Sequence, residues 1–245
     1  KDGEIYMIEV NPRASRTVPF VSKAIGRPLA KIGAKGMVGI TLAEQGFTSE
    51  IIPEHSAVKY PVFPFTKFPG SDIILGPEMR STGESLGIDD DIGAAFAKAY
   101  ESTGHKLPLS GTVFVSVKDA DKREILPLAR QLVGFGFRIV ATGGTSKVLT
   151  RNGVKNDRIL KIAEGRPNIA DLLKDRKVDL VINTPSGIGA RSDEAAIRGL
   201  AVAQGISCIT TLAGAAAAIS AIEAKMRYGA RVKPLQEYTQ TSTGG

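Results

Sequence analysis

The stretch GTVFVSVKDADKREILPLARQLVGFGFRIVATGG, residues 111–144, decides the fold. It begins with an apolar run at 111–117 and ends with a second apolar run at 137–141. Between the two runs we expect a helix that ends near Phe135, and Pro127 predicts a late start or a kink in it. Strands that are apolar throughout are typical of sheets buried on both faces. The stretch therefore predicts a strand, a covering helix and a second, parallel strand.

The same alternation continues towards the end of the chain. Further strands are expected at 159–162, 179–183 and 207–210. Helices are expected from Thr145, Asn168 and Arg191, and a last, alanine-rich helix follows the final strand. Strands that alternate with helices form a parallel sheet with helices on both faces. The sequence therefore predicts an α/β fold with a doubly wound, parallel five-stranded sheet.

Polar side chains stand at the carboxyl ends of these strands, where open parallel sheets bind their ligands. In ATGGTS, residues 141–146, Gly143 and Gly144 allow backbone N–H groups to approach a ligand. Thr145 opens a helix whose positive end attracts a phosphate. The alternative is that Thr145 only caps its helix. The hydroxyls and amides at the strand ends are Ser116, Thr142, Asn183, Thr184, Thr210 and Thr211.

Two lysines are expected close to the same crevice. Lys122 lies at the start of the predicted helix after the first strand, and Lys161 lies at the end of the predicted strand 159–162. Either lysine alone is more often a solvated charge. Both together with the glycine loop favour a phosphate-bearing ligand.

The segment EIYMIEVNPR, residues 4–13, predicts a strand near the start of the chain. Glu9, Asn11 and Arg13 share one face of such a strand because side chains alternate. A carboxylate and an amide oxygen suit a magnesium ion, and an arginine suits a polyphosphate. In the alternative reading Ile5 and Met7 belong to a core and the polar residues only face water. A helix is expected from about Thr17.

Composition limits the classes of partner. The 42% of hydrophobic residues can form a core, and 32 Lys and Arg against 25 Asp and Glu favour anionic partners. Nucleic acid is not expected, because the basic residues are scattered and only 6% of the residues are aromatic.

The only cysteine, Cys208, excludes an internal disulfide. No apolar run reaches the roughly 20 residues that span a bilayer, and the segment KDGE does not resemble a leader, so we expect no membrane and a cytoplasmic protein.

Long stretches of the chain resemble the large subunit of carbamoyl-phosphate synthetases. The segment from Glu4 to Gly39 resembles the end of the second ATP-grasp domain, and KYPVFPFTKFPGSDIILGPEMRSTGESLGID, residues 59–89, resembles the segment that follows it. The remainder resembles the methylglyoxal-synthase-like regulatory domain. The resemblance implies an incomplete end of an ATP-grasp domain at 1–88, a helix and linker at 89–110, and an allosteric domain at 111–245.

The resemblance also implies ligands and partners. The parent ligase joins bicarbonate, ammonia from glutamine and two ATP into carbamoyl phosphate for pyrimidine and arginine biosynthesis, with a glutamine amidotransferase small subunit and the remainder of the large subunit as partners. Glu9 and Asn11 would bind magnesium or manganese, and Arg13 and Arg16 would contact ATP phosphate. A nucleotide monophosphate, UMP or IMP, would be the allosteric effector. Its predicted contacts are Ser116, Lys122, Thr142, Gly143, Gly144, Thr145, Lys161, Asn183 and Thr184.

Two kinds of rival function stay open. Methylglyoxal synthase has a catalytic aspartate in Gly-Asp-Gln-Gln and a histidine after the fourth strand, but this chain has Arg166 in GRPN and no histidine in NTPSGIGARSDEA. The inosinate-forming cyclohydrolase has a Lys-Thr-Leu-His-Pro run that is absent here, and His55 and His105 both precede the sheet. A free-standing nucleotide-sensing module is the non-enzyme alternative. Pro185 replaces a threonine of the family's Asn-Thr-Thr-Ser-Gly loop, which leaves the identity of the nucleotide open.

Overall fold

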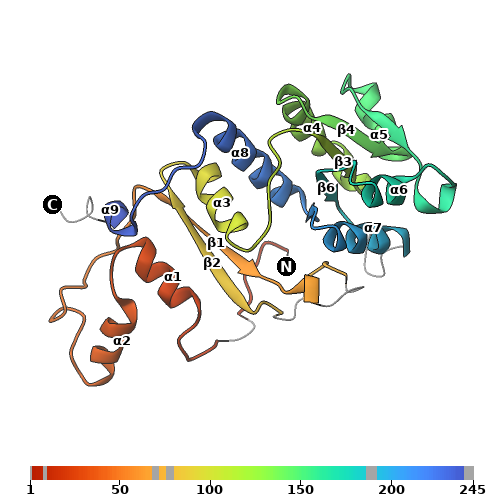
Figure 1. Cartoon of the computed structure of the whole chain (residues 1–245). Coiled ribbons are helices and arrows are strands. Elements are labelled where there is room, and N and C mark those ends of the chain that lie inside the picture. Colours follow the sequence, from red (N-terminus) through yellow and green to blue (C-terminus); the bar gives the residue numbers. More distant parts are fainter. Residues whose placement is uncertain (1, 8–9, 68–71, 76–79, 186–191, 240–245) are drawn as a thin grey trace. The chain divides into compact units, whose positions relative to one another are not determined.

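The computed structural model describes residues 2–7, 10–67, 72–75, 80–185 and 192–239. The chain forms two compact units, one from residues up to 54 with the segment from 233, and one from residues 55–232. The larger unit contains the predicted sheet (Figure 1).

The sheet of the larger unit has five parallel strands in the order β5-β4-β3-β6-β7. The first strand of this sheet, β3, lies in the middle. The next two strands, β4 and β5, are added on one side of it, and β6 and β7 are added on the other side. This order is that of a doubly wound sheet, so the predicted fold class is confirmed. The strands are β3 (Thr112–Ser116), β4 (Arg138–Thr142), β5 (Asp157–Ile159), β6 (Leu180–Asn183) and β7 (Ser207–Ile209).

Helices cover both faces of this sheet (Figure 1). Val113 and Val115 of β3 belong to one core cluster, with residues of α4, α5 and α8, whereas Phe114 belongs to a second cluster with residues of α6 and α7. Adjacent residues of β3 therefore belong to two different cores, which explains why the middle of this strand is apolar on both faces. The helices are α4 (Ile125–Gly134), α5 (Gly143–Arg151), α6 (Ile169–Lys174), α7 (Ser192–Ala203) and α8 (Leu212–Tyr228).

An antiparallel strand pair precedes the sheet in the larger unit. Strand β1 (Ser56–Val62) pairs with β2 (Gly83–Asp89), and α3 (Ile92–Glu101) packs against both strands and against α8. Asp91 caps α3 by accepting a hydrogen bond from the Ala94 N–H at 2.9 Å. Tyr100 of α3 joins the same core cluster as Val113 of the sheet.

The smaller unit contains three helices among the residues described, α1 (Thr17–Ala24), α2 (Leu29–Met37) and α9 (Leu235–Thr239). The start of α1 at Thr17 is as predicted. Ser22 joins α1 to α2, because its hydroxyl accepts a hydrogen bond from the Leu29 N–H at 3.1 Å.

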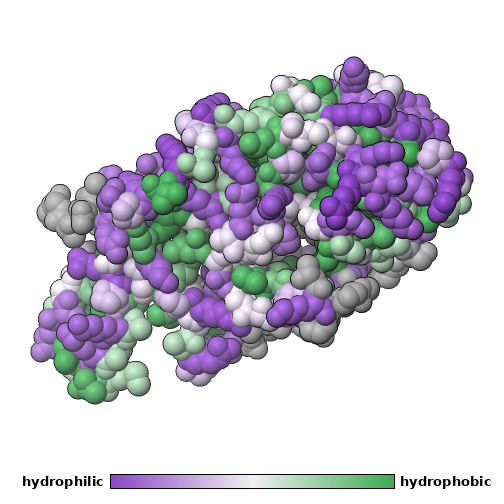
Figure 2. Space-filling model, in the orientation of Figure 1, coloured by the Kyte–Doolittle hydropathy of each residue, from purple (hydrophilic) through white to green (hydrophobic). Residues whose placement is uncertain are grey.

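Hydrophobic side chains of the smaller unit remain accessible to solvent. Figure 2 shows hydrophobic surface over the region of α2, where Met37 is 88% exposed and Val38 is 77% exposed. Such side chains normally gain stability from burial, so this surface is suited to contact with further protein. In the part of the chain that is described, no helix has the length and apolarity to cross a membrane.

The strand predicted at 4–13 does not form among the described residues of that stretch. Residues 4–7 and 10 have no regular structure, and Ile5 and Met7, the alternative core residues, are 99% and 83% exposed. A strand is stable only when a neighbouring strand accepts its hydrogen bonds, and the described residues provide no such neighbour here. The prediction followed the side-chain alternation, which carries no information about a partner.

Other boundaries also differ from the predictions. Helix α5 begins at Gly143, two positions before Thr145, because the two glycines can also form the first turn of a helix. Strand β5 ends at Ile159, so Lys161 lies after the strand and precedes a short 3-10 helix at Ile162–Glu164. Pro127 is the third residue of α4, which agrees with a late start. Helix α2 and strands β1 and β2 were not predicted.

Gly87 allows α3 to lie directly on β2, so we predict that Gly87→Ala is strongly destabilising. A Cβ at this position would be 1.9 Å from the carbonyl oxygen of Ala95 and 2.6 Å from the backbone nitrogen of Ala99, which cannot move without moving α3. We expect a loss of about 3 kcal/mol in the free energy of unfolding, measured by denaturant titration with circular dichroism. Gly83→Ala is the matched control on the same strand, because its Cβ would meet only Val62 at 3.7 Å. Equal stability of the two variants would contradict this packing.

Candidate functional site

A cavity of about 620 Å³ opens at the carboxyl ends of β3 and β4. This is the edge at which the sequence placed the ligand site, and the volume suits a small organic ligand. Six of the predicted site residues line it: Ser116, Lys122, Thr142, Gly144, Thr145 and Lys161. The other residues that line it are Val117, Lys118, Asp119, Ala120, Ala163, Glu164, Asp193, Glu194 and Ile197.

Three hydroxyl groups connect the strand ends at the floor of the cavity. The hydroxyls of Ser116 and Thr142 are 2.9 Å apart and share a hydrogen bond. Thr145 accepts a hydrogen bond from the backbone N–H of Val117 at 3.2 Å. The alternative that Thr145 only caps its helix is wrong, because Thr142 occupies the N-cap position and the Thr145 hydroxyl bonds to the chain after β3.

The ammonium group of Lys122 lies beside the first turn of α5. A Cβ added to Gly144 would be 2.9 Å from Lys122 Nζ, so glycine leaves the space that this side chain uses. Lys122 also forms an ion pair with Asp119, which is 95% exposed. The first N–H groups of a helix have no partner within the helix and carry partial positive charge. The lysine and the helix end therefore present positive charge at one place in the cavity.

The lining residues around Lys161 carry both signs of charge. Lys161 precedes the 3-10 helix, and its backbone N–H donates to the carboxylate of Glu164 at 2.9 Å. Asp193 of α7 accepts a hydrogen bond from the backbone N–H of Ala163 at 3.0 Å. The cavity thus combines lysine ammonium groups with carboxylates that can accept hydrogen bonds from hydroxyl groups.

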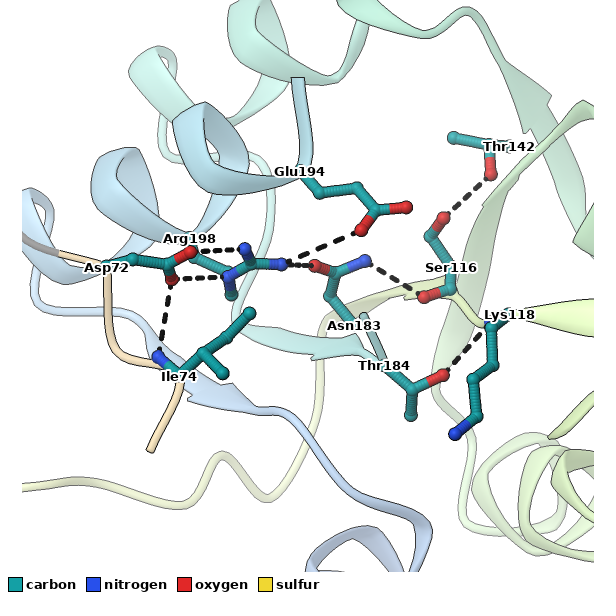
Figure 3. Close-up of polar contacts among 9 residues, drawn as sticks. All are labelled: Asp72, Ile74, Ser116, Lys118, Thr142, Asn183, Thr184, Glu194 and Arg198. Carbon is teal, nitrogen blue, oxygen red and sulfur yellow. Dashed lines mark hydrogen bonds and ion pairs between the residues drawn. The ribbon is translucent and has the colours of Figure 1, made fainter. Parts of the chain in front are cut away.

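Asn183 and Thr184 lie behind the lining of the cavity (Figure 3). Asn183 is only 1% exposed, and its side-chain amide donates to the carbonyl oxygen of Ser116 at 3.0 Å. Thr184 accepts a hydrogen bond from the backbone N–H of Lys118 at 3.0 Å. Both residues hold the chain at the end of β3, which carries Ser116. Their direct contact with a ligand stays a prediction.

A buried arginine holds Asn183 from the other side. Arg198 of α7 is 0% exposed and donates from Nη1 to the side-chain oxygen of Asn183 at 2.8 Å. Its Nε and Nη2 donate to the two carboxylate oxygens of Asp72 at 2.7 and 2.5 Å. These hydrogen bonds from Arg198 hold the pKa of the Asp72 carboxyl below its ordinary value, against the effect of its partial burial. Figure 3 shows this chain of contacts leading towards Ser116 and Thr142.

The predicted ATP and metal residues belong to the smaller unit. Asn11, Arg13 and Arg16 are all exposed, and the Arg13 N–H donates to the Asn11 carbonyl oxygen at 2.8 Å. Glu9 lies outside the described residues. Among the residues that the structure describes, no group of three or more His, Cys, Asp or Glu side chains could hold a metal ion. The metal and phosphate roles of these residues stay predictions.

Sequence reasoning missed the acidic residues of the cavity and the arginine behind it. Asp193 and Glu194 fall at the start of α7, where acidic residues are common for the helix dipole alone. The sequence gives only a weak indication that Arg198 has a structural role: it stands beside Ile197 on the buried side of an amphipathic helix, where a cation is unusual. No sequence pattern indicates that Asp72 is its partner, because the two residues are 126 positions apart.

Two family models match parts of the chain. Residues 124–210 match the MGS-like domain, and residues 1–45 match the ATP binding domain of the carbamoyl-phosphate synthase L chain. A crystal structure of methylglyoxal synthase from Elizabethkingia anophelis covers 46% of this chain and 80% of its own length, with 21% identity and a TM-score of 0.40. The two family matches define a chain with an MGS-like domain that follows a segment of an ATP-binding domain.

The curated relatives are more specific. Carbamoyl phosphate synthase large chains from Nostoc and Archaeoglobus fulgidus are 53% and 55% identical over 96% and 99% of this chain. The arginine-specific chloroplastic large chain from Oryza sativa is 50% identical over 98% of it. The chain therefore belongs to the carbamoyl phosphate synthase large-chain family and corresponds to its C-terminal part. It spans 21% to 23% of the length of these relatives.

The lowered pKa of Asp72 predicts how the stability of the chain depends on pH. A carboxyl group whose pKa is lower in the folded state stabilises the fold above its unfolded pKa of about 3.9, and this contribution is lost as the pH falls through the folded pKa. We expect Asp72→Asn to be less stable than the unaltered chain at pH 6, and the difference to shrink as the pH approaches 2. Urea titrations across this range measure it. A difference that stays constant with pH would contradict the ion pair.

Proposed function

We propose that the chain is the C-terminal part of a glutamine-hydrolysing carbamoyl phosphate synthase large subunit, and that its cavity is an allosteric site for a nucleotide monophosphate. The observation that carries the proposal is the position of the Lys122 ammonium group beside the first turn of α5. Free N–H groups at a helix start and a lysine within reach form a binding site for phosphate.

The lining supports a phosphate at one end of the cavity. Ser116, Thr142 and Thr145 offer hydroxyl groups near the start of α5, and Lys161, which also lines the cavity, adds a second cation. Two positive charges and several hydroxyl donors match a dianionic phosphate. Gly143 and Gly144 keep side chains away from the start of the helix.

The remaining volume supports a nucleoside. At about 620 Å³ the cavity exceeds what a phosphate alone fills, and Glu164, Asp193 and Glu194 provide carboxylates for ribose hydroxyls. UMP and IMP both fit this description. Carboxylates beside the phosphate subsite disfavour a polyphosphate, because a second and third phosphate would add negative charge next to them.

The smaller unit supports the synthetase role. It carries the segment that matches the ATP binding domain, and Arg13 and Arg16 are exposed there, where they can contact a polyphosphate. Glu9 and Asn11 would hold magnesium or manganese, which would bring the ATP phosphates and those arginines together. Carboxylate and amide oxygens are donors that such hard cations prefer, and a site built on them needs further ligands from other segments.

The proposed partners are the remainder of the large subunit and a glutamine amidotransferase small subunit. The exposed apolar side chains of the smaller unit, such as Met37 and Val38, are suited to packing against that remainder. The proposed product, carbamoyl phosphate, supplies pyrimidine and arginine biosynthesis, and we infer a cytoplasmic enzyme with no membrane or nucleic-acid partner.

The methylglyoxal-synthase-like alternative lacks its acid and base. Arg166 is 77% exposed at its side chain and pairs with Asp171, and His105 stacks on Tyr100, so neither can provide proton transfer in the cavity. A free-standing nucleotide sensor remains a second candidate, favoured by the self-contained cavity in the larger unit. The match of residues 1–45 to an ATP-binding domain favours the synthetase.

Lys161→Ala is predicted to weaken binding of UMP or IMP by about tenfold or more, because a hydrogen bond to a charged phosphate contributes roughly 1.5 to 3 kcal/mol. Isothermal titration calorimetry with the 245-residue chain measures the effect. Lys147→Ala is the control, since Lys147 is exposed on α5 and does not line the cavity. An unchanged Kd in Lys161→Ala would contradict the assignment.

The purified chain by itself is predicted to form no carbamoyl phosphate from bicarbonate, ammonia and ATP. Its match to the ATP binding domain covers residues 1–45 only, and the exposed Arg13 and Arg16 need further segments to enclose a nucleotide. A radiochemical assay with labelled bicarbonate tests this, with the full-length large chain of Archaeoglobus fulgidus as the positive control. Product formation by the chain alone would show that its ATP site is complete.

A further inference from the structure

A continuous series of polar contacts joins the connection between β1 and β2 to the floor of the cavity. Asp72 binds Arg198, Arg198 binds the side chain of Asn183, and Asn183 binds the carbonyl of Ser116 (Figure 3). The hydroxyl of Ser116 then bonds to Thr142 in the cavity lining. Each contact in the series is between 2.5 and 3.0 Å long.

Burial makes this series sensitive to the presence of Asp72. The guanidinium of Arg198 has no exposed surface, and a buried cation without a counter-charge is strongly destabilising. Asp72 meets it with both carboxylate oxygens, which is the geometry that best satisfies an arginine. The second carboxylate nearby belongs to Glu194, whose oxygen is 4.0 Å from Arg198 Nη1 and which lines the cavity.

We propose that Arg198 is a positioning residue of the anion cavity, and that through it the segment 72–75 is coupled to ligand binding. This inference rests on the proposed function, because the ligand is the phosphate-bearing effector. Arg198 and Asp72 touch no atom of the ligand. They act through Asn183 and Glu194.

Asn183 transmits the position of Arg198 to β3. Its side-chain oxygen accepts from Arg198, which fixes the orientation of the amide and directs the NH₂ group to the carbonyl of Ser116. Without the guanidinium the amide can rotate and the end of β3 loses this support. The hydroxyl of Ser116 then loses its fixed position beside Thr142.

Glu194 transmits the effect to the other side of the cavity. When Asp72 is absent, Glu194 is the nearby carboxylate that can compensate the charge of Arg198, and it can do so by moving out of the lining. Loss of Asp72 therefore alters two parts of the cavity together. Because linkage is reciprocal, a ligand that favours the ordered cavity also favours the bound position of 72–75.

Asp72→Asn tests the coupling because it removes the counter-charge of Arg198 and keeps the shape of the side chain, and the loss of stability that it causes is compared with that of a control variant. We expect the Kd for UMP and for inorganic phosphate to rise about fivefold or more in the 245-residue chain, measured by calorimetry. Asp89→Asn is the matched control. Asp89 is also a carboxylate paired with cations, Lys98 at 2.8 Å and Arg231 at 2.9 Å, but it lies outside the series of contacts that joins Asp72 to Ser116.

Hydrogen exchange gives a second readout that a loss of stability alone does not move. In the unaltered chain, saturating UMP should slow the exchange of the amides of Ile73, Ile74 and Leu75, and this protection should disappear in Asp72→Asn but persist in Asp89→Asn. Binding of UMP with an unchanged Kd in Asp72→Asn would overturn the coupling and leave the proposed function intact. Absence of any binding of UMP, IMP or phosphate to the unaltered chain would overturn both.

Discussion

The requirement that parallel strands be connected by crossovers determines where this protein has its cavity. Each crossover returns the chain to the same end of the sheet, so all five strands finish at one edge. Ser116, Thr142 and Asn183 are far apart in the sequence but come together there. This arrangement also determines the positions of Lys122 beside α5 and of the buried Arg198, which bonds to Asn183.

Much of the larger unit follows from its sequence. The apolar strands and the intervening helices predicted a doubly wound parallel sheet, because consecutive strands covered on both faces have few topologies open to them. The strand ends, the glycine loop and the two lysines together predicted six lining residues of the cavity. Local sequence patterns were sufficient for these predictions, because each strand and the polar residue at its carboxyl end are neighbours in the sequence.

The features that sequence reasoning missed depend on distant segments. Residues 4–7 have the alternation of a strand but form none, since pairing requires a neighbour that alternation cannot specify. The ion pair of Asp72 and Arg198 joins two segments with no common pattern. The start of α5 was displaced by two residues because the glycines that predicted a loop also fit the first turn of a helix.

The packing of α3 has a consequence for the way such proteins exchange parts during evolution. Tyr100 and Leu107 share one core cluster with Val113 of β3, and the hydroxyl of Ser207 in β7 donates to the carbonyl of Lys106 at 2.7 Å. A gene fusion that transferred only the five-stranded sheet would leave this face open to water. The heritable module is therefore larger than the sheet and includes β1, β2 and α3, so recombination points that preserve folding are expected before β1.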